Sequence, residues 1–402
     1  MSDTPPAGER ASRPLPLDGI TVLDLGQIYQ GPYAGFLLAM SGARVIKVEP
    51  VRGEALRSRL HSLPYAMLNS AKEAVSLNLK SPRGSELFLQ LASAADAVLC
   101  NFAPGVPERL GIDAPSLWET NPRLVFAQAS GYGLEGPDAQ RTAMDLTVQA
   151  HMGSMSITGF PDQPPTKAGA AFVDFLGGSH LYGAVVTALF EAQRTGVGRM
   201  VSTSMAEAAY FTLTTSLQSW HLHGTSERSG NRNAAMSVAP SNVYPCIDGH
   251  IALIAAADRH WRSVLEVIGR ADLIDDERYR RNGDRAARMD EVDELVSSWT
   301  SKRPRAEVAA ALSSAGVPIA EVRDLPEIVH DEHLNERGFL QWAELDGLGE
   351  IPLPHSPLRW HDSQMRPLTE SRSVGADNET VYSEFCGLDA DDLAALAAEG
   401  VV

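Results

Sequence analysis

One carboxylate interrupts an apolar run near the middle of the sequence. In the stretch AFVDFLGGSH, Asp174 lies between apolar neighbours, and Gly177 and Gly178 follow closely. Desolvating a charge costs free energy, so a carboxylate in such surroundings is a helix cap, a paired core charge or a reacting group. Aspartate is a common cap where a loop becomes a helix. A carboxylate nucleophile is the functional alternative, since surroundings that exclude water also favour covalent catalysis.

The two glycines fit the second interpretation. Without side chains, Gly177 and Gly178 would let a substrate carbonyl approach the backbone, whose N–H groups would face a developing oxyanion. The apolar residues on both sides of Asp174 weaken the cap interpretation, because a cap normally lies in an exposed turn. From the residues alone, both interpretations stay open.

Signatures of other chemistries are missing from the sequence. The turn DLGQIYQGPYAG lacks the G-x-G-x-x-G spacing of dinucleotide-binding folds. Neither a P-loop, a G-x-S-x-G elbow nor an H-E-x-x-H motif occurs. His221 and His223 are separated by one residue, which rarely places both rings on one ion. We therefore expect no metal and no resident cofactor.

The charge balance is strongly acidic. Lys and Arg number 34 and Asp and Glu number 51, so the formal net charge is −17. This excludes general nucleic-acid binding, which depends on cations meeting phosphates, but it permits a local basic pocket for a small anion. No apolar run reaches the roughly 18 residues that span a bilayer, so no membrane partner is expected. Three cysteines without metal or disulfide spacing favour a cytoplasmic location: Cys100, Cys246 and Cys386.

The first half of the chain alternates the patterns of strands and helices. Ser81 followed by Pro82 is typical of a helix start. This order predicts a parallel sheet covered by helices on both faces. The expected strands are Ile20–Leu25, Ala43–Glu49, Ala97–Phe102 and Leu124–Gly133, and the expected helices are Gly31–Gly42, Ser81–Asp96 and a long one after Gly178.

Five stretches together resemble the type III CoA-transferase family, which includes CoA-transferases and α-methylacyl-CoA racemases. They occur in the family's order, and the resemblance extends from about Pro16 to the C-terminal GLDADDLAALAAEGVV. Each motif is modest, but the ordered set is specific. The stretches are PLDGITVLDLGQIYQGPYAGFLLAMSGARVIKVEP, NSAKEAVSLNLKSPRG, NFAPGVPERLGID, NPRLVFAQASGYGLEGP and AGAAFVDFLGGSHLYGAVVTALFEAQRTGVGR.

The resemblance implies that Asp174 is the catalytic nucleophile. Its carboxylate would attack the thioester of an acyl-CoA, such as succinyl-CoA, and form a mixed anhydride and then an aspartyl-CoA thioester. CoA would thus pass to a second carboxylic acid as a substrate, with no further cofactor. The alternatives are a racemase or epimerase, an intramolecular CoA isomerase, and a protein that only binds acyl-CoA.

Met144 and Asp145 decide between transferase and racemase. The racemases use a His–Asp pair in a segment similar to RTAMDLTVQA, where this chain has Met144 before Asp145. A thioether cannot exchange a proton, so a two-base mechanism lacks one base. The sequence therefore favours a transferase, with Met144 as a packing residue.

The resemblance implies several further substrate contacts. Tyr29 and Gln30, in the turn after the first strand, are expected near the active-site carboxylates. Lys47, Arg52 and Lys72 are candidates for the CoA phosphates, although each is more often a solvated surface cation.

Tyr132 and Glu135, in GYGLEGP, are also candidate contacts, with a simple turn carboxylate as the commoner role for Glu135. Met144 and Asp145 complete the set of candidate substrate contacts.

The implied fold is a Rossmann-like large domain with a parallel sheet plus a smaller α+β domain, in an interlocked homodimer. The large domain would combine the N-terminal half with the C-terminal strands. The expected segments are a disordered tail (1–16), the first part of the large domain (17–222), a linker (223–242), the small domain (243–322), a second linker (323–344) and the return to the large domain (345–402).

Overall fold

The computed structural model describes residues 13–58, 63–345 and 347–402, so most of the predicted disordered tail lies outside the described residues. Contacts between residues divide the chain into two units. Unit 1 comprises the residues up to 148, residues 170–209 and residues 331–402. Unit 2 comprises residues 149–169 and 210–330.

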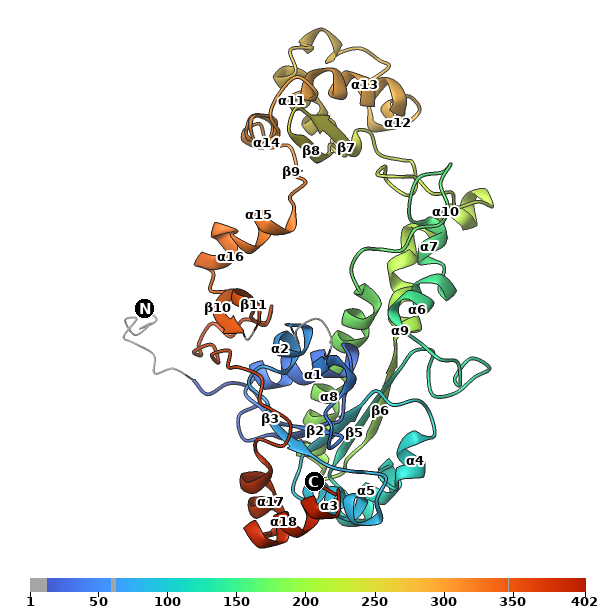
Figure 1. Cartoon of the computed structure of the whole chain (residues 1–402). Helices are drawn as coiled ribbons and strands as arrows, with labels where there is room; N and C mark the ends of the chain where they lie inside the picture. Colours follow the sequence, from blue (N-terminus) through green and yellow to red (C-terminus); the bar gives the residue numbers. More distant parts are fainter. Residues whose placement is uncertain (1–12, 59–62, 346) are drawn as a thin grey trace, which may run out of the picture. The chain divides into compact units, whose positions relative to one another are not determined.

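A six-stranded parallel sheet forms the centre of unit 1 (Figure 1). The strand order β3-β2-β1-β4-β5-β6 is that of doubly wound nucleotide-binding folds. Leu23 of the central strand lies opposite Ile46 on one side and Val98 on the other. The predicted α/β class is confirmed. The strands are β1 (Thr21–Asp24), β2 (Arg44–Glu49), β3 (Glu73–Ser76), β4 (Ala97–Cys100), β5 (Val125–Ser130) and β6 (Met200–Ser204).

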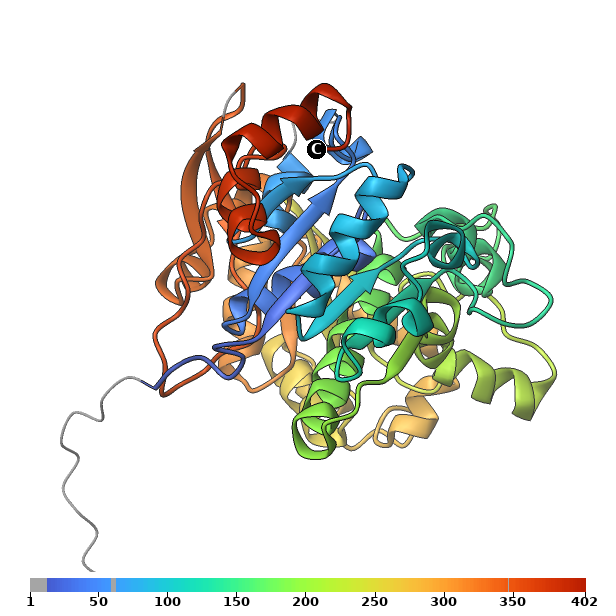
Figure 2. The same ribbon diagram turned by 90° about the horizontal axis from the view of Figure 1, so that it is seen from below.

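Helices cover both faces of the sheet, because successive strand residues point to opposite sides. Val22 and Val45 belong to the core under α1 and α8. Leu23 and Ile46 belong to the core under α3, α5 and the C-terminal helices α17 and α18, which are red in Figure 2. These helices are α1 (Gln30–Met40), α3 (Pro82–Ser93), α5 (Ala114–Thr120), α8 (Phe172–Thr195), α17 (Asn378–Cys386) and α18 (Ala390–Ala398).

The start of α3 agrees with the sequence. The Ser81 hydroxyl accepts the N–H of Gly84 at 2.9 Å, and Pro82 opens the helix. This bond satisfies one of the free N–H groups of the first turn.

The C-terminal segment of unit 1 pairs with the N-terminal sheet. The Ala74 N–H donates to Asp377 Oδ2 at 2.8 Å, and the Tyr382 hydroxyl donates to Ser76 O at 2.8 Å. Unit 1 also holds an antiparallel pair of strands, β10 (Leu340–Leu345) and β11 (Gly349–Pro354).

Unit 2 contains a three-stranded antiparallel sheet and a core of its own. Tyr244 and Ile251 of the sheet pack with Trp261, Val292 and Val308 from three helices. The elements are β7 (Ser241–Cys246), β8 (Gly249–Ile254), β9 (Ile319–Glu321), α11 (Asp258–Val267), α13 (Met289–Thr300) and α14 (Arg305–Ser314).

Shorter helices complete the two units. They are α2 (Leu63–Asn69), α4 (Val106–Leu110), α6 (Asp145–His151), α7 (Ser154–Ile157), α9 (Met205–Tyr210), α10 (Thr214–His223), α12 (Asn282–Ala286), α15 (Leu325–Val329), α16 (Glu332–Glu336) and the 3-10 turns η1 (Ala55–Ser58), η3 (Phe211–Leu213) and η4 (Ala271–Leu273).

Helix α8 is long and apolar enough to cross a membrane. Buried core helices of soluble proteins have the same length and composition. Helix α8 packs against α1, β5 and β6 within unit 1. This single helix is therefore weak evidence for a membrane span.

Candidate active site

Asp174 lies in the first turn of α8. The helix begins at Phe172 and not, as the sequence predicted, after Gly178. Its N-cap residue is Ala171, whose side chain makes no hydrogen bond to the first turn of the helix. Asp174 therefore does not cap α8, and the cap interpretation is wrong.

Asp145 takes the capping role instead. Its Oδ2 accepts the N–H of Val173 at 3.1 Å and the N–H of Asp174 at 3.4 Å. These are two of the N–H groups that the first turn of a helix leaves free. The contact joins the start of α6 to the start of α8 and places two carboxylates side by side.

Burial and Asp145 together change the ionisation of Asp174. Only 9% of its surface is exposed. Loss of solvent, and secondarily the negative charge of Asp145, raise the pKa of Asp174 to about 7. The Asp174 carboxyl group therefore changes between its protonated and ionised forms near neutral pH.

Gly177 and Gly178 lie inside α8, where they allow α1 to approach closely. A Cβ on Gly177 would collide with Gln30 Nε2, and a Cβ on Gly178 would lie 2.6 Å from Gln30 O. Because both residues are helical, their N–H groups belong to the i to i−4 ladder and are not free for an oxyanion. The predicted oxyanion role is corrected to a packing role.

Tyr29 and Gln30, named from the sequence, do lie beside the start of α8. Gln30 is buried against Gly177, and its Nε2 donates to Ser130 O at 3.5 Å. The Tyr29 ring stacks on Phe175 at 5.9 Å between centroids, and the Tyr33 ring meets Phe175 edge-on at 4.9 Å.

The turn that presents Tyr29 is fixed by two side chains. The Gln27 N–H donates to Asn101 Oδ1 at 2.7 Å, and Asn101 Nδ2 donates back to Gln27 O at 2.8 Å. The Ile28 N–H donates to Glu54 Oε2 at 3.0 Å, which holds Ile28 at a left-handed φ of 64°.

Three other predicted residues lie in or next to the loop between β5 and α6. Tyr132 is half-buried, and Glu135 is exposed in the turn. Met144 precedes α6 with 50% of its surface exposed, so its predicted packing role is not observed.

Lys72 differs from the surface cation that the sequence predicted. It is buried, and its Nζ donates to Asp24 Oδ2 at 2.7 Å, Pro32 O at 2.8 Å and Asn69 Oδ1 at 3.0 Å. All three ammonium donors are used, so this side chain offers none to a phosphate.

Lys47 is also buried, and it donates to Gly26 O.

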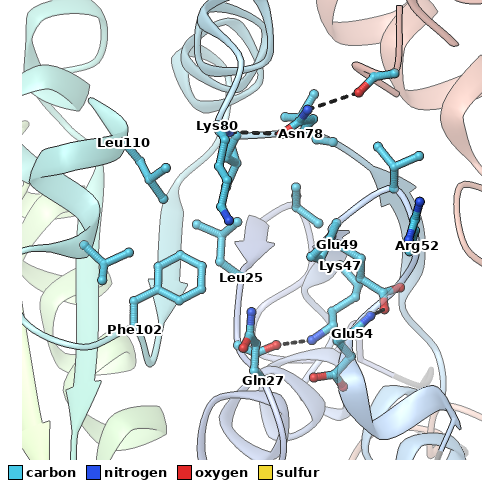
Figure 3. A pocket seen from close by; sticks show the side chains of 18 residues that line it. Leu25, Gln27, Lys47, Glu49, Arg52, Glu54, Asn78, Lys80, Phe102 and Leu110 are labelled. Atoms are coloured by element: carbon cyan, nitrogen blue, oxygen red, sulfur yellow. Dashed lines mark hydrogen bonds between the residues drawn. The ribbon is translucent and has the colours of Figure 1, made fainter. Parts of the chain in front are cut away.

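A cavity of about 860 Å³ opens at the carboxyl ends of β1 to β4 (Figure 3). Lys47 and Arg52 line it, whereas Lys72 does not. Asn78, Lys80 and Phe102 also line the cavity, and the sequence analysis did not predict them. These residues follow strands β3 and β4, and only the fold shows that these strands lie close to β1 and β2 in the sheet. In doubly wound folds this edge, where the strand order reverses between β1 and β4, holds ligands.

Among the described residues, no three His, Cys, Asp or Glu side chains are arranged to hold a metal ion.

The chain is similar to known proteins over most of its length. Residues 17–378 match the model of CoA-transferase family III. An acetyl-CoA:oxalate CoA-transferase of Acetobacter aceti is 33% identical, over 91% of this chain and 94% of the relative. A succinyl-CoA–D-citramalate CoA-transferase of Chloroflexus aurantiacus is 31% identical, over 97% of this chain and 98% of the relative. The crystal structure of a CAIB/BAIF family protein from Brucella suis is 27% identical and superposes with a TM-score of 0.81, covering 93% of this chain and 100% of the other.

Proposed function

This chain belongs to CoA-transferase family III and is a CoA-transferase, and from that premise we propose that Asp174 is the nucleophile that carries CoA from an acyl-CoA to a carboxylic acid. The observation that carries the proposal is a buried carboxylate at the start of α8, with which no cation of the described residues pairs and whose pKa is raised to about 7. A carboxylate of higher basicity is a better nucleophile once ionised.

The proposed transfer proceeds by exchange of anions. Asp174 attacks the thioester carbonyl, a C–O bond forms, the C–S bond breaks, and the CoA thiolate leaves with the electron pair. The thiolate attacks the Asp174 carbonyl of this anhydride, which gives an aspartyl-CoA thioester and releases the first acid as its carboxylate. An acceptor carboxylate then reverses both steps and leaves as acyl-CoA. No step consumes a proton, because each anion that enters displaces another.

We place the nucleotide end of CoA in the cavity at the carboxyl ends of β1 to β4. Arg52 and Lys80 line it as exposed cations, which suits phosphate groups. Glu49 adds little repulsion because Arg57 pairs with it at 2.6 Å. The lining cations Lys47, Arg52 and Lys80 outnumber its acidic residues Glu49 and Glu54, which supports binding of an anion to a chain of net charge −17.

Intact-protein mass spectrometry tests the nucleophile. The protein is mixed briefly with acetyl-, succinyl- and phenylacetyl-CoA, and the wild type should gain the mass of CoA less water, as expected for an aspartyl thioester. Asp174→Ala should gain none, and Asp275→Ala, at an exposed site, should behave as the wild type. An adduct on Asp174→Ala, or transfer at the wild-type rate by that variant, would show that another group carries CoA.

Racemisation is the weaker alternative. Met144 stands where a proton-exchanging histidine would be needed, and its side chain is half-exposed. Proton exchange at the α-carbon in deuterated water, without acyl transfer, would favour that alternative.

We also propose a cytoplasmic homodimer, interlocked as the family resemblance implies. Unit 1 exposes Phe190 and Val197 at the end of α8, and unit 2 exposes Phe211, Trp220 and Leu222 along η3 and α10. Large apolar side chains left exposed in the single chain are typical of subunit contacts. Three free cysteines accord with a reducing compartment.

A further inference from the structure

A second cavity, of about 560 Å³, lies in unit 1 beside the start of α8. Its wall is built by α1, α2, the start of α8 and the residues flanking β10 and β11. We call it the aromatic cavity; the lining residues used below are Tyr29, Tyr33, Phe36, Phe175, Phe339 and His355. Its volume is that of an ordinary small-molecule site.

The aromatic cavity and Asp174 both lie at the start of α8. Ala171 and Phe175 line the cavity. Asp174 lies between these two residues in the sequence, in the first turn of the helix. A thioester attacked by Asp174 therefore has this cavity beside it for its acyl group.

The lining offers an acyl group no charge. None of the described residues that line the cavity is Asp, Glu, Lys or Arg. Bringing a second carboxylate into such surroundings, without a cation, is costly, whereas an alkyl or aryl chain is stabilised by burial.

One polar atom of the lining lacks a partner. His355 is 5% exposed, and its Nε2 donates to Arg366 O at 2.7 Å. A neutral imidazole that donates through Nε2 keeps Nδ1 as an acceptor, and no described residue donates to it. Because Nδ1 is closed to solvent, it offers a bound acyl group no hydrogen bond.

We infer that the aromatic cavity holds the acyl group of an apolar acid, aliphatic or aromatic. The inference rests on the proposed function, because it takes Asp174 as the group that attacks the thioester. The proposed apolar acid differs from the dicarboxylic acids oxalate and D-citramalate, for which two relatives of this chain are named.

The test compares half-reactions, in which an acyl-CoA converts the free enzyme to its CoA adduct. The probes are phenylacetyl-CoA, hexanoyl-CoA, acetyl-CoA and succinyl-CoA. We expect kcat/KM for the best apolar donor to exceed that for succinyl-CoA by at least about tenfold.

One variant and its control examine the lining. Ala171→Leu narrows the cavity and should lower the phenylacetyl-to-acetyl ratio of kcat/KM by about tenfold. Ala306→Leu, at an exposed site, should keep this ratio.

The outcomes separate this inference from the proposed function. Adduct formation with succinyl-CoA equal to or faster than with every apolar donor overturns the acyl assignment and leaves Asp174 as nucleophile. Binding is also measured calorimetrically with Asp174→Ala, which cannot form the adduct. If no donor forms an adduct, the same apolar preference in binding supports the cavity assignment, and its absence overturns it.

Discussion

At the scale of single residues, the chemistry depends on two aspartates in contact. Asp145 binds the first N–H groups of α8 and so occupies the position where the helix dipole would stabilise an anion. Asp174 is thereby left buried, beside a negative charge and without a cation among the causes of its pKa shift. This arrangement makes the ionised form of Asp174 high in energy and hence reactive.

The first prediction concerns the pH dependence of transfer. Only the ionised carboxylate attacks, so kcat/KM should fall below an apparent pKa near 7, which is the raised pKa of Asp174. Asp145→Asn keeps an oxygen for the N–H groups of α8 but removes the charge. The acid limb should therefore move to lower pH, as measured from pH 5 to 9. A limb that stays in place in Asp145→Asn would contradict the role of its charge.

The second prediction concerns stability. A raised carboxyl pKa means that the folded state binds the proton more tightly, so wild-type stability decreases as pH rises from about 4 to 7. Asn at this position does not titrate. Asp174→Asn should gain about 2–4 kcal/mol relative to the wild type between pH 4.5 and pH 8, measured by denaturant unfolding. Asp275→Asn, at an exposed site, serves as control, and a pH-independent difference for Asp174→Asn would refute the assignment.

Part of this site was predictable from sequence. Apolar neighbours revealed that Asp174 is desolvated, and the resemblance supplied its role. The capping by Asp145 was not predictable, because it joins residues far apart in sequence through the fold. His355 gave no local signal either, since its surroundings come from α1, α2 and α8.

At the scale of elements, the start of α8 shows why a local pattern misled. Two adjacent glycines are unfavourable inside a helix, which suggested a loop before the helix. The structure keeps them because Gln30 of α1 occupies the space that their side chains would need. Packing between two helices outweighed helix propensity here. By contrast, the cap of α3 depends only on Ser81 and Gly84, and the sequence located it correctly.

The third prediction concerns the ion pair of Asp24 and Lys72. Lys72 joins β1, α1 and α2 through buried hydrogen bonds. Lys72→Ala would leave Asp24 buried without its cation, so the free energy of unfolding should fall by about 3–5 kcal/mol. Adding Asp24→Asn should recover part of this loss. The matched control is Lys80→Ala, at an exposed site, which should change stability by less than about 0.5 kcal/mol. Equal effects of Lys72→Ala and Lys80→Ala would rule out a structural role for Lys72.

At the scale of the whole molecule, alternation of strand and helix patterns sufficed for the parallel sheet. This alternation could not predict the order of the strands in the sheet, because that order depends on which strands pair across long connections. The same limit applies to the pairing of the C-terminal segment with β3, in which Asp377 and Tyr382 bond to Ala74 and Ser76.

The last prediction concerns assembly. Phe211 is 77% exposed and Trp220 is 59% exposed in the chain alone. Leaving such side chains in water forgoes about 25 cal/mol per Å² of apolar area that a partner would bury. Light scattering should therefore give twice the chain mass of 43.2 kDa.

A carboxylate in that contact would be desolvated without a cation, so Phe211→Asp and Trp220→Asp should each shift the protein toward monomer. Ile247→Asp is the matched control, because Ile247 is equally apolar and 65% exposed but lies in the turn between β7 and β8. A wild type that remains monomeric at micromolar concentration while transferring CoA would refute the dimer. Dissociation by Ile247→Asp to the same extent would instead place the contact on the β7–β8 turn as well.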